Sequence, residues 1–409
     1  MPDFDTRRPQ EPDQPNRLRS RSPTNGVRNL VSAPRLRTLS IGGAILLCVV
    51  VAVSLLAGRY YYAALSRSPS PSAGAKEADR GIATHPAERT TPSVMPKQPC
   101  EGIHPDAIRN GKIAFDLADE ALPVIQDPKG EGIAKPDVWT VNPNGSDPVN
   151  LTGDSRSFDE TPAWSPDGRR IAFARAGADN SEWICVVGPD GSDSTDISLP
   201  GDEGVYEPSW SPDGRRIAFW SLSPCHLYLA NADGSGTPKR LPTPGLSGCA
   251  ARPEWSPDGR RIAFVGPGEA TGTNIYLMNV SPEGATSGLR RLTDNRFFEE
   301  YPAWSPDGTQ IAFSSNRAFL RETQYGVKLH QSEIYKIDVA SLKVTRLTHS
   351  PLMDTEPTWS PDGEQIAYVK QKLFRGTHSS IYKMDSDGSN STPVFEKEHK
   401  YAFNPAWAP

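Results

Sequence analysis

Acidic side chains recur a few residues before a repeated Pro-x-Trp triplet, and they are the strongest candidates for chemistry in the sequence. They are Asp159, Glu160, Glu207, Glu299, Glu300, Asp354 and Glu356. If the segments that carry them meet around one axis, their carboxylates would attract a cation or a basic peptide segment. An acidic residue at a recurring position can instead bond backbone N–H groups of the neighbouring repeat. Both interpretations are open at this point.

Motifs of catalytic and metal sites are missing from the chain. No G-x-S-x-G nucleophile elbow occurs, and the nearest string, GLSGC at residues 245–249, lacks the final glycine. The seven histidines follow neither H-E-x-x-H nor H-x-x-x-H spacing. We therefore predict no catalytic residue, no metal and no cofactor. The alternative is a site assembled from separate repeats, in a hydrolase or lyase that acts on carbohydrate or a small ester.

The elements that must position these residues come from an internal repeat. The string P-x-W-S-P-D-G-x-x-I-A-F/Y occurs five times, and a truncated sixth copy, PAWAP, ends the chain. The repeat tryptophans are Trp164, Trp210, Trp255, Trp304, Trp359 and Trp407. A period of about 45–55 residues is typical of one four-stranded blade of a β-propeller.

Each repeat predicts four short strands. An S-P-D-G turn joins the P-x-W strand to the I-A-F strand, since proline presets φ, aspartate bonds the backbone and glycine accepts a positive φ. A third strand follows, such as residues 275–278 (IYLM), and then a fourth, such as residues 290–293 (RRLT). We expect Trp, Ile and Phe of the repeat to pack between blades and to have no chemical role.

The two ends of the repeat region predict how the propeller closes. The first I-A-F strand, within residues 111–115, has no P-x-W strand before it, and the last P-x-W strand has no I-A-F strand after it. Together they complete one blade. We therefore predict an all-β, six-bladed propeller in which the C-terminal strand closes the ring and removes free sheet edges.

One face of this propeller is the expected binding surface. Loops between the second and third strands share a face with the linkers between blades, and the seven acidic residues lie in those linkers. They would therefore surround one mouth of the central channel. The longest loops on this loop face are residues 116–136, 316–332 and 369–380. Long loops on a rigid scaffold commonly carry binding sites.

The cysteines are compatible with an exported domain. Cys225 falls in a loop and Cys249 in the following linker, on the same predicted face, so a disulfide between them is plausible. Cys185 lies within a predicted third strand and Cys100 just before the first blade. Their pairing stays open, and buried or free thiols are the other interpretation.

The repeated PAWSPDGxxIAF…IYxM…DGS…RRLT pattern resembles the propeller repeats of the TolB family. The resemblance covers residues 111–409 and implies a TolB-like propeller. TolB itself has an α/β domain ahead of its propeller and works with outer-membrane lipoproteins and Tol proteins. Here an apolar segment and a tether occupy that place, so the resemblance does not imply TolB itself, and a fold does not transfer a function.

The N-terminal region predicts a membrane anchor. Residues 38–58 contain no charge, and 21 residues of helix span about 30 Å, the thickness of a bilayer core. The eight arginines before this segment predict a cytoplasmic N-terminus and a propeller on the other side of the membrane. A cleaved signal peptide is the alternative. The expected parts are a disordered basic tail (1–37), a transmembrane helix (38–58), a Ser/Pro-rich linker (59–99) and the propeller (100–409).

Charge narrows the class of partner. Residues 111–409 contain 29 basic and 40 acidic residues, a net charge of −11. Nucleic acid is therefore not an expected ligand, since phosphate binding relies on Lys and Arg. We predict a monomeric propeller that binds a protein or an envelope polymer through its loop face, as a scaffold module without catalytic activity.

Overall fold

The computed structural model describes residue 100 and residues 111–119, 136–153, 157–177, 181–188, 194–199, 204–269, 272–322, 328–372 and 378–409. Every described residue belongs to the unit Tyr60–Pro409. The tail, membrane helix and linker predicted for residues 1–99 lie outside the described residues. Within the described part, no helix is long and apolar enough to cross a membrane.

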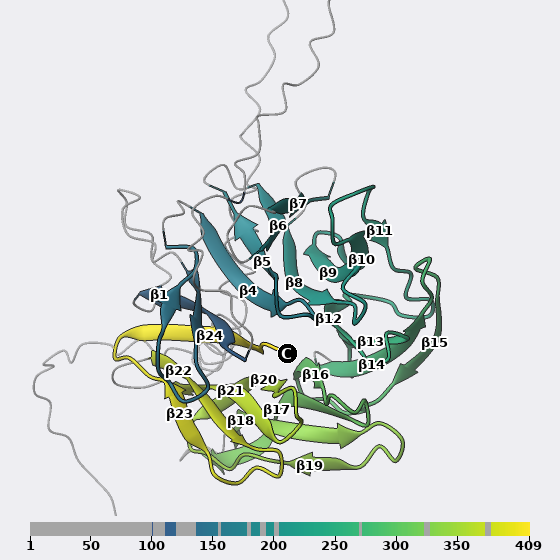
Figure 1. Ribbon diagram of the computed structural model, residues 1–409. Helices are drawn as coiled ribbons and strands as arrows, with labels where there is room; N and C mark the ends of the chain where they lie inside the picture. The colour runs from purple at the N-terminus through teal and green to yellow at the C-terminus, as the bar shows by residue number, and fades with distance from the viewer. Residues whose placement is uncertain are drawn as a thin grey trace, which may run out of the picture. The chain divides into compact units, whose positions relative to one another are not determined.

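Four separate antiparallel sheets of four strands follow one another along the chain (Figure 1). The first contains β4 (Phe158–Trp164), β5 (Ile171–Ala176), β6 (Glu182–Val187) and β7 (Thr195–Ile197). The second contains β8 (Val205–Trp210), β9 (Arg216–Leu222), β10 (Cys225–Asn231) and β11 (Lys239–Arg240). The third contains β12 (Ala251–Trp255), β13 (Arg261–Pro267), β14 (Thr273–Val280) and β15 (Thr286–Arg291). The fourth contains β16 (Glu299–Trp304), β17 (Gln310–Glu322), β18 (Lys328–Asp338) and β19 (Val344–Arg346).

The remaining strands form one eight-stranded sheet. Its first half contains β20 (Met353–Trp359), β21 (Gln365–Lys372), β22 (His378–Asp385) and β23 (Thr392–Phe395). Its second half contains β24 (Lys400–Trp407), β1 (Ile113–Asp119), β2 (Asp137–Val141) and β3 (Val149–Asn150). Within it β24 pairs with β1, from Ile113 opposite Trp407 to Asp119 opposite Lys400. The two ends of the repeat region therefore lie in one sheet.

The prediction of six separate blades needs correction, since the described strands form four separate blades and this eight-stranded sheet. The cause is a single parallel bridge, Ser379 opposite Tyr401, that joins β22 to β24. The Ser379 hydroxyl also donates to the Ala402 carbonyl at 2.8 Å. The all-β propeller fold itself is confirmed.

The first strand of each sheet and β24 lie around a common axis, with the C-terminus near its centre (Figure 1). In circular order they are β24, β4, β8, β12, β16 and β20, and each contacts the next. We call these six the axial strands. A residue at the same position in each of them therefore lies in a ring around the axis.

The S-P-D-G turns form as the repeat predicts. In the β4–β5 turn the Ser165 hydroxyl donates to Asp167 Oδ1 at 2.6 Å, and the Arg170 amide donates to that hydroxyl at 2.8 Å. Gly168 has a φ of 64°, which favours glycine. The hydrogen bond from Ser165 holds the pKa of Asp167 below its usual value, so this aspartate stabilises the turn.

The repeat tryptophans pack between sheets, and several also bond to the preceding axial strand. The Trp210 indole N–H donates to the Ala163 carbonyl at 3.1 Å. The Trp304 indole N–H donates to the backbone carbonyl of Glu254 at 3.2 Å. Arg170 lies over the Trp210 ring at 4.7 Å from its centroid. These contacts link neighbouring sheets in addition to apolar burial.

Two disulfides join the four cysteines of the described residues. Cys100 pairs with Cys185 of β6, with 6.0 Å between their Cα atoms, and both side chains are buried. The structure also pairs Cys225 with Cys249, with Cα atoms 4.8 Å apart. The first disulfide therefore fixes the entry of the chain into the propeller against the first separate sheet.

Candidate functional site

A left-handed residue recurs in every axial strand, three positions before the repeat tryptophan. These residues are Thr161, Glu207, Arg252, Tyr301, Glu356 and Asn404, with φ between 49° and 56°. Each precedes the proline of P-x-W, and the pairing register shifts there, as at a β-bulge. A left-handed conformation costs a non-glycine residue about 1–2 kcal/mol. Its recurrence in all six strands shows that the bulge shapes the axis.

Polar contacts connect these residues around the axis. Asp116 accepts hydrogen bonds from the Thr161 amide at 3.2 Å and the Asn404 side chain at 2.5 Å. The Thr161 hydroxyl accepts one from the Glu207 amide at 3.3 Å, and the Glu356 carboxylate accepts one from the Asn404 amide at 2.5 Å. We call Asp116 and the six left-handed residues the girdle.

Arg252 contributes a positive charge to the girdle. Its guanidinium binds the Glu207 carboxylate at 2.5 Å and lies 3.6 Å from the centroid of the Tyr301 ring. Glu207 also accepts a hydrogen bond from the Trp220 indole at 2.8 Å. Burial is the largest effect on Tyr301 and raises the pKa of its phenol well above the usual value. The girdle is therefore a cross-linked polar ring, in which Glu207 and Glu356 have structural roles.

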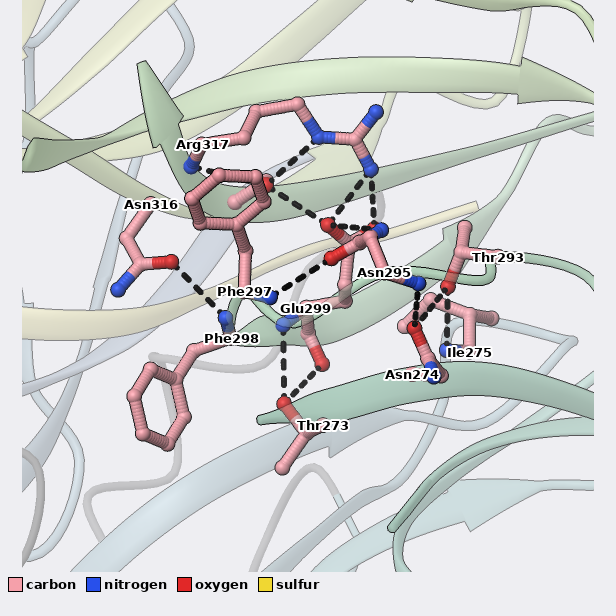
Figure 2. A network of polar contacts seen from close by, with 11 residues as sticks. Thr273, Asn274, Ile275, Thr293, Asn295, Phe297, Phe298, Glu299, Asn316 and Arg317 are labelled. Carbon is pink, nitrogen blue, oxygen red and sulfur yellow. Dashed lines mark hydrogen bonds and ion pairs between the residues drawn. The ribbon is translucent and has the colours of Figure 1, made fainter. Parts of the chain in front are cut away.

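The structure places the predicted acidic residues in different environments. Asp159 is fully buried and forms a bidentate pair with Arg175, at 2.6 and 2.9 Å. Glu299 is also fully buried, and Figure 2 shows it bound by Arg317 at 2.6 Å to each oxygen and by Asn295 at 3.1 Å. The Ser315 hydroxyl donates to the same carboxylate at 2.8 Å. Arginines of the same sheet therefore bind these two acids, whereas the structural interpretation named backbone N–H groups of the neighbouring repeat.

Asp354 is fully buried as well but lacks such a partner. Neither of its carboxylate oxygens has a hydrogen-bond partner in the described part of the chain. Burial, the largest effect, raises its pKa to about 7, and the nearby Lys370 opposes that rise. At neutral pH this carboxyl is therefore partly protonated.

In addition to Glu207 of the girdle, three glutamates of the axial strands are partly exposed. Glu160 and Glu300 stand at equivalent positions of β4 and β16, four residues before the tryptophan. Burial raises the pKa of Glu300, and Arg252 opposes that rise. Glu254 of β12 lies directly before its tryptophan, and burial raises its pKa to about 7. We call Glu160, Glu254 and Glu300 the axial glutamates.

Glu254 was not among the candidates predicted from the sequence. A signal for it exists, because the residue before the tryptophan is alanine, serine or threonine in the other repeats and glutamate only here. The other repeats therefore have a small side chain at that position. A single carboxyl among small residues explains why its charged form is disfavoured.

Among the described residues, one group of three potential metal ligands lies close together, formed by Cys100, Cys185 and Asp196. Its two sulfurs form the disulfide and offer no thiolate to a metal. None of the seven predicted acidic residues belongs to it.

Comparisons with known proteins agree with this architecture. Residues 178–320 match the family of the TolB beta propeller domain. TolB from Acinetobacter baumannii is 22% identical with a TM-score of 0.54, over 75% of this chain and 68% of that chain. A chain of a nidogen/laminin complex is 12% identical with a TM-score of 0.53, over 73% of this chain and 99% of that chain. A putative TolB from Agrobacterium tumefaciens is 21% identical with a TM-score of 0.46, over 73% of this chain and 99% of that chain.

The fold and the axis define a β-propeller with a polar axial ring. The family match over residues 178–320 confirms the resemblance to TolB propeller repeats that the sequence predicted. At these identities the solved structures establish the fold alone.

Proposed function

We propose that this chain is a non-catalytic binding scaffold whose axial glutamates receive a basic segment of a protein or envelope polymer. Glu160, Glu254 and Glu300 are the observation that carries the proposal. They are partly exposed on axial strands, whereas Asp159 and Glu299 are fully buried and bound by arginines. Carboxyls whose pKa is raised by burial gain the most from a positive ligand, because the ligand offsets the cost of their charged form.

The location proposed for the scaffold is the outer side of a membrane. Two disulfides among the described residues fit an oxidising compartment. The apolar segment 38–58 would anchor the chain with its N-terminus in the cytoplasm, and residues 59–99 would tether the propeller. We further propose that each half of the eight-stranded sheet acts as a blade, which gives six, since the halves share only one parallel bridge.

A binding titration tests the proposal on the full-length chain purified in detergent. The probe is a fluorescent decapeptide rich in arginine and glycine, followed by anisotropy at about 0.1 M salt. We expect the double variant Glu254→Gln, Glu300→Gln to bind about tenfold more weakly, a loss of about 1.4 kcal/mol.

The matched control removes the same two charges elsewhere. Glu283 and Glu364 are exposed in the β14–β15 and β20–β21 turns, away from the loop face. Their double replacement by glutamine should leave the affinity within about twofold, because exposed charges are screened over roughly 10 Å. Equal weakening by both double variants would reduce the effect to net charge and would contradict an axial site.

A further inference from the structure

Three axial strands carry a fully buried acid five residues before the tryptophan, and only one of these acids is unpaired. Asp159 on β4 binds Arg175, and Glu299 on β16 binds Arg317. Asp354 on β20 occupies the same position, and both its oxygens lack a hydrogen-bond partner. A buried carboxylate without a partner is costly, so this site needs a compensating group.

The candidate for that group is opposite Asp354 on the next strand. In the strand register, Asp354 stands opposite Lys370 of β21, and Lys370 stands opposite Ser380 of β22. The Ser380 hydroxyl is buried and lacks a hydrogen-bond partner as well. Lys370 therefore stands between three unsatisfied oxygens, two on one side and one on the other.

The ammonium of Lys370 lies elsewhere in this structure. Its Nζ is 4.6 Å from the ring centroid of Tyr382 and 5.6 Å from that of Tyr368. Both tyrosines follow the same face of β21 and β22, where Tyr368 pairs with Tyr382. A cation over aromatic rings is stabilised without a carboxylate. The Lys370 ammonium therefore has two alternative binding positions, one over the tyrosine rings and one at the Asp354 carboxylate.

In the described part of the chain, the second cation that acts on Asp354 is Arg346, and it is already bound. Glu333 on β18 is fully buried and binds Arg346 of β19 at 2.8 Å, which occupies that arginine. The Thr348 hydroxyl, which also lies near Asp354, donates to Glu333. Glu333 adds to the rise in the pKa of Asp354, while Lys370, the Thr348 hydroxyl and Arg346 oppose it. Burial raises the pKa of both Tyr368 and Tyr382, so these phenols stay neutral.

We propose that Asp354 and Lys370 form a proton-controlled switch at the junction of the fourth separate sheet with the eight-stranded sheet. While Asp354 holds its proton, the Lys370 ammonium stays over Tyr382 and Tyr368. When the carboxyl releases that proton to solvent, the ammonium moves across β21 and donates to the Asp354 carboxylate and to Ser380. The pKa of about 7 places this change near neutral pH. Asp354 lies two residues from Glu356, so the switch changes charge beside the girdle.

Lysine NMR on the full-length chain tests the switch. With 13C at lysine Cε, the Hε protons of Lys370 should show an upfield ring-current shift at pH 5.5. We expect that shift to be lost with a midpoint near pH 7. Lys370→Met identifies the signal by its disappearance, and Asp354→Asn should hold it upfield up to pH 8.5.

Two results would overturn the switch. One is a wild-type Lys370 signal that does not move between pH 5.5 and 8.5. This result is read on the wild-type chain and does not depend on whether a variant folds. The other is the same transition in Asp354→Asn. Ser380→Ala should keep the transition but shift its midpoint upward, because the paired state loses one acceptor. The axial glutamates take no part in this readout, so its failure leaves the proposed binding site standing.

Discussion

Arg252 stacks on Tyr301, with 3.6 Å between its guanidinium carbon and the centroid of the ring, and the two residues come from adjacent axial strands. Both occupy the left-handed position before the proline of P-x-W. Because Arg252 also binds Glu207 on the other neighbouring strand, one side chain joins three axial strands. The girdle is therefore a structural link between sheets as well as the lining of the axis.

Removal of Arg252 should expose this link. Arg252→Ala leaves the Glu207 carboxylate without its guanidinium, and we expect a loss of about 3 kcal/mol in the free energy of unfolding by urea. Adding Glu207→Gln should recover part of that loss, because the unpaired charge is removed. A double variant no more stable than Arg252→Ala would show that the pair is not coupled.

Glu254 should make stability fall as pH rises. Its pKa is about 7 in the folded chain and near 4.5 when unfolded, so the folded state holds the proton more tightly. Stability is therefore highest below about pH 4.5 with respect to this group, declines up to about pH 7 and is constant above. We expect the stability of Glu254→Gln relative to wild type to rise by about 2–3 kcal/mol between pH 5 and pH 8. An equal difference at both pH values would contradict the assignment.

The indole hydrogen bonds between sheets can be measured by a matched pair of variants. Trp210 donates to Ala163, whereas the Trp255 indole N–H has no partner among the described residues. Phenylalanine keeps an aromatic ring in both places. We expect Trp210→Phe to cost about 1 kcal/mol more than Trp255→Phe in urea unfolding. Equal costs would mean that the bond contributes nothing net.

The disulfides predict a thiol count. Cys100, Cys185, Cys225 and Cys249 are paired, and the sequence contains one further cysteine, Cys48. Denatured protein that has not been reduced should therefore react with one equivalent of a thiol reagent. After reduction it should react with five. Reaction with three or more equivalents before reduction would show that at least one of the two disulfides is not formed. It would also weaken the argument for an oxidising compartment.

The sequence was sufficient for the features set by neighbours along the chain. The S-P-D-G turns form because Ser165, Asp167 and Gly168 meet within a few residues, and the tryptophan period locates each sheet. The pairing of β24 with β1 could also be inferred, since each was an incomplete repeat.

Features set by contacts across the ring could not be predicted in this way. The residue before a proline normally avoids a left-handed conformation, yet Thr161 and Glu356 adopt it because six axial strands converge. The partners of Asp159 and Asp354 depend on which side chain stands opposite, arginine in one sheet and lysine in the other. The bridge of Ser379 to Tyr401, which merges two blades into one sheet, leaves no trace in the repeat pattern.

Calorimetry of peptide binding tests the axial glutamates most directly. Arginine-rich peptide is titrated into the full-length chain at pH 7 in two buffers of different ionisation enthalpy, which gives the number of protons exchanged. Positive charge at the axis lowers the raised pKa of Glu254 and Glu300, so we predict net proton release by wild type. The Glu254→Gln, Glu300→Gln variant should release none. Binding without proton release by wild type, or equal release by the variant, would contradict a ligand seated on these carboxyls.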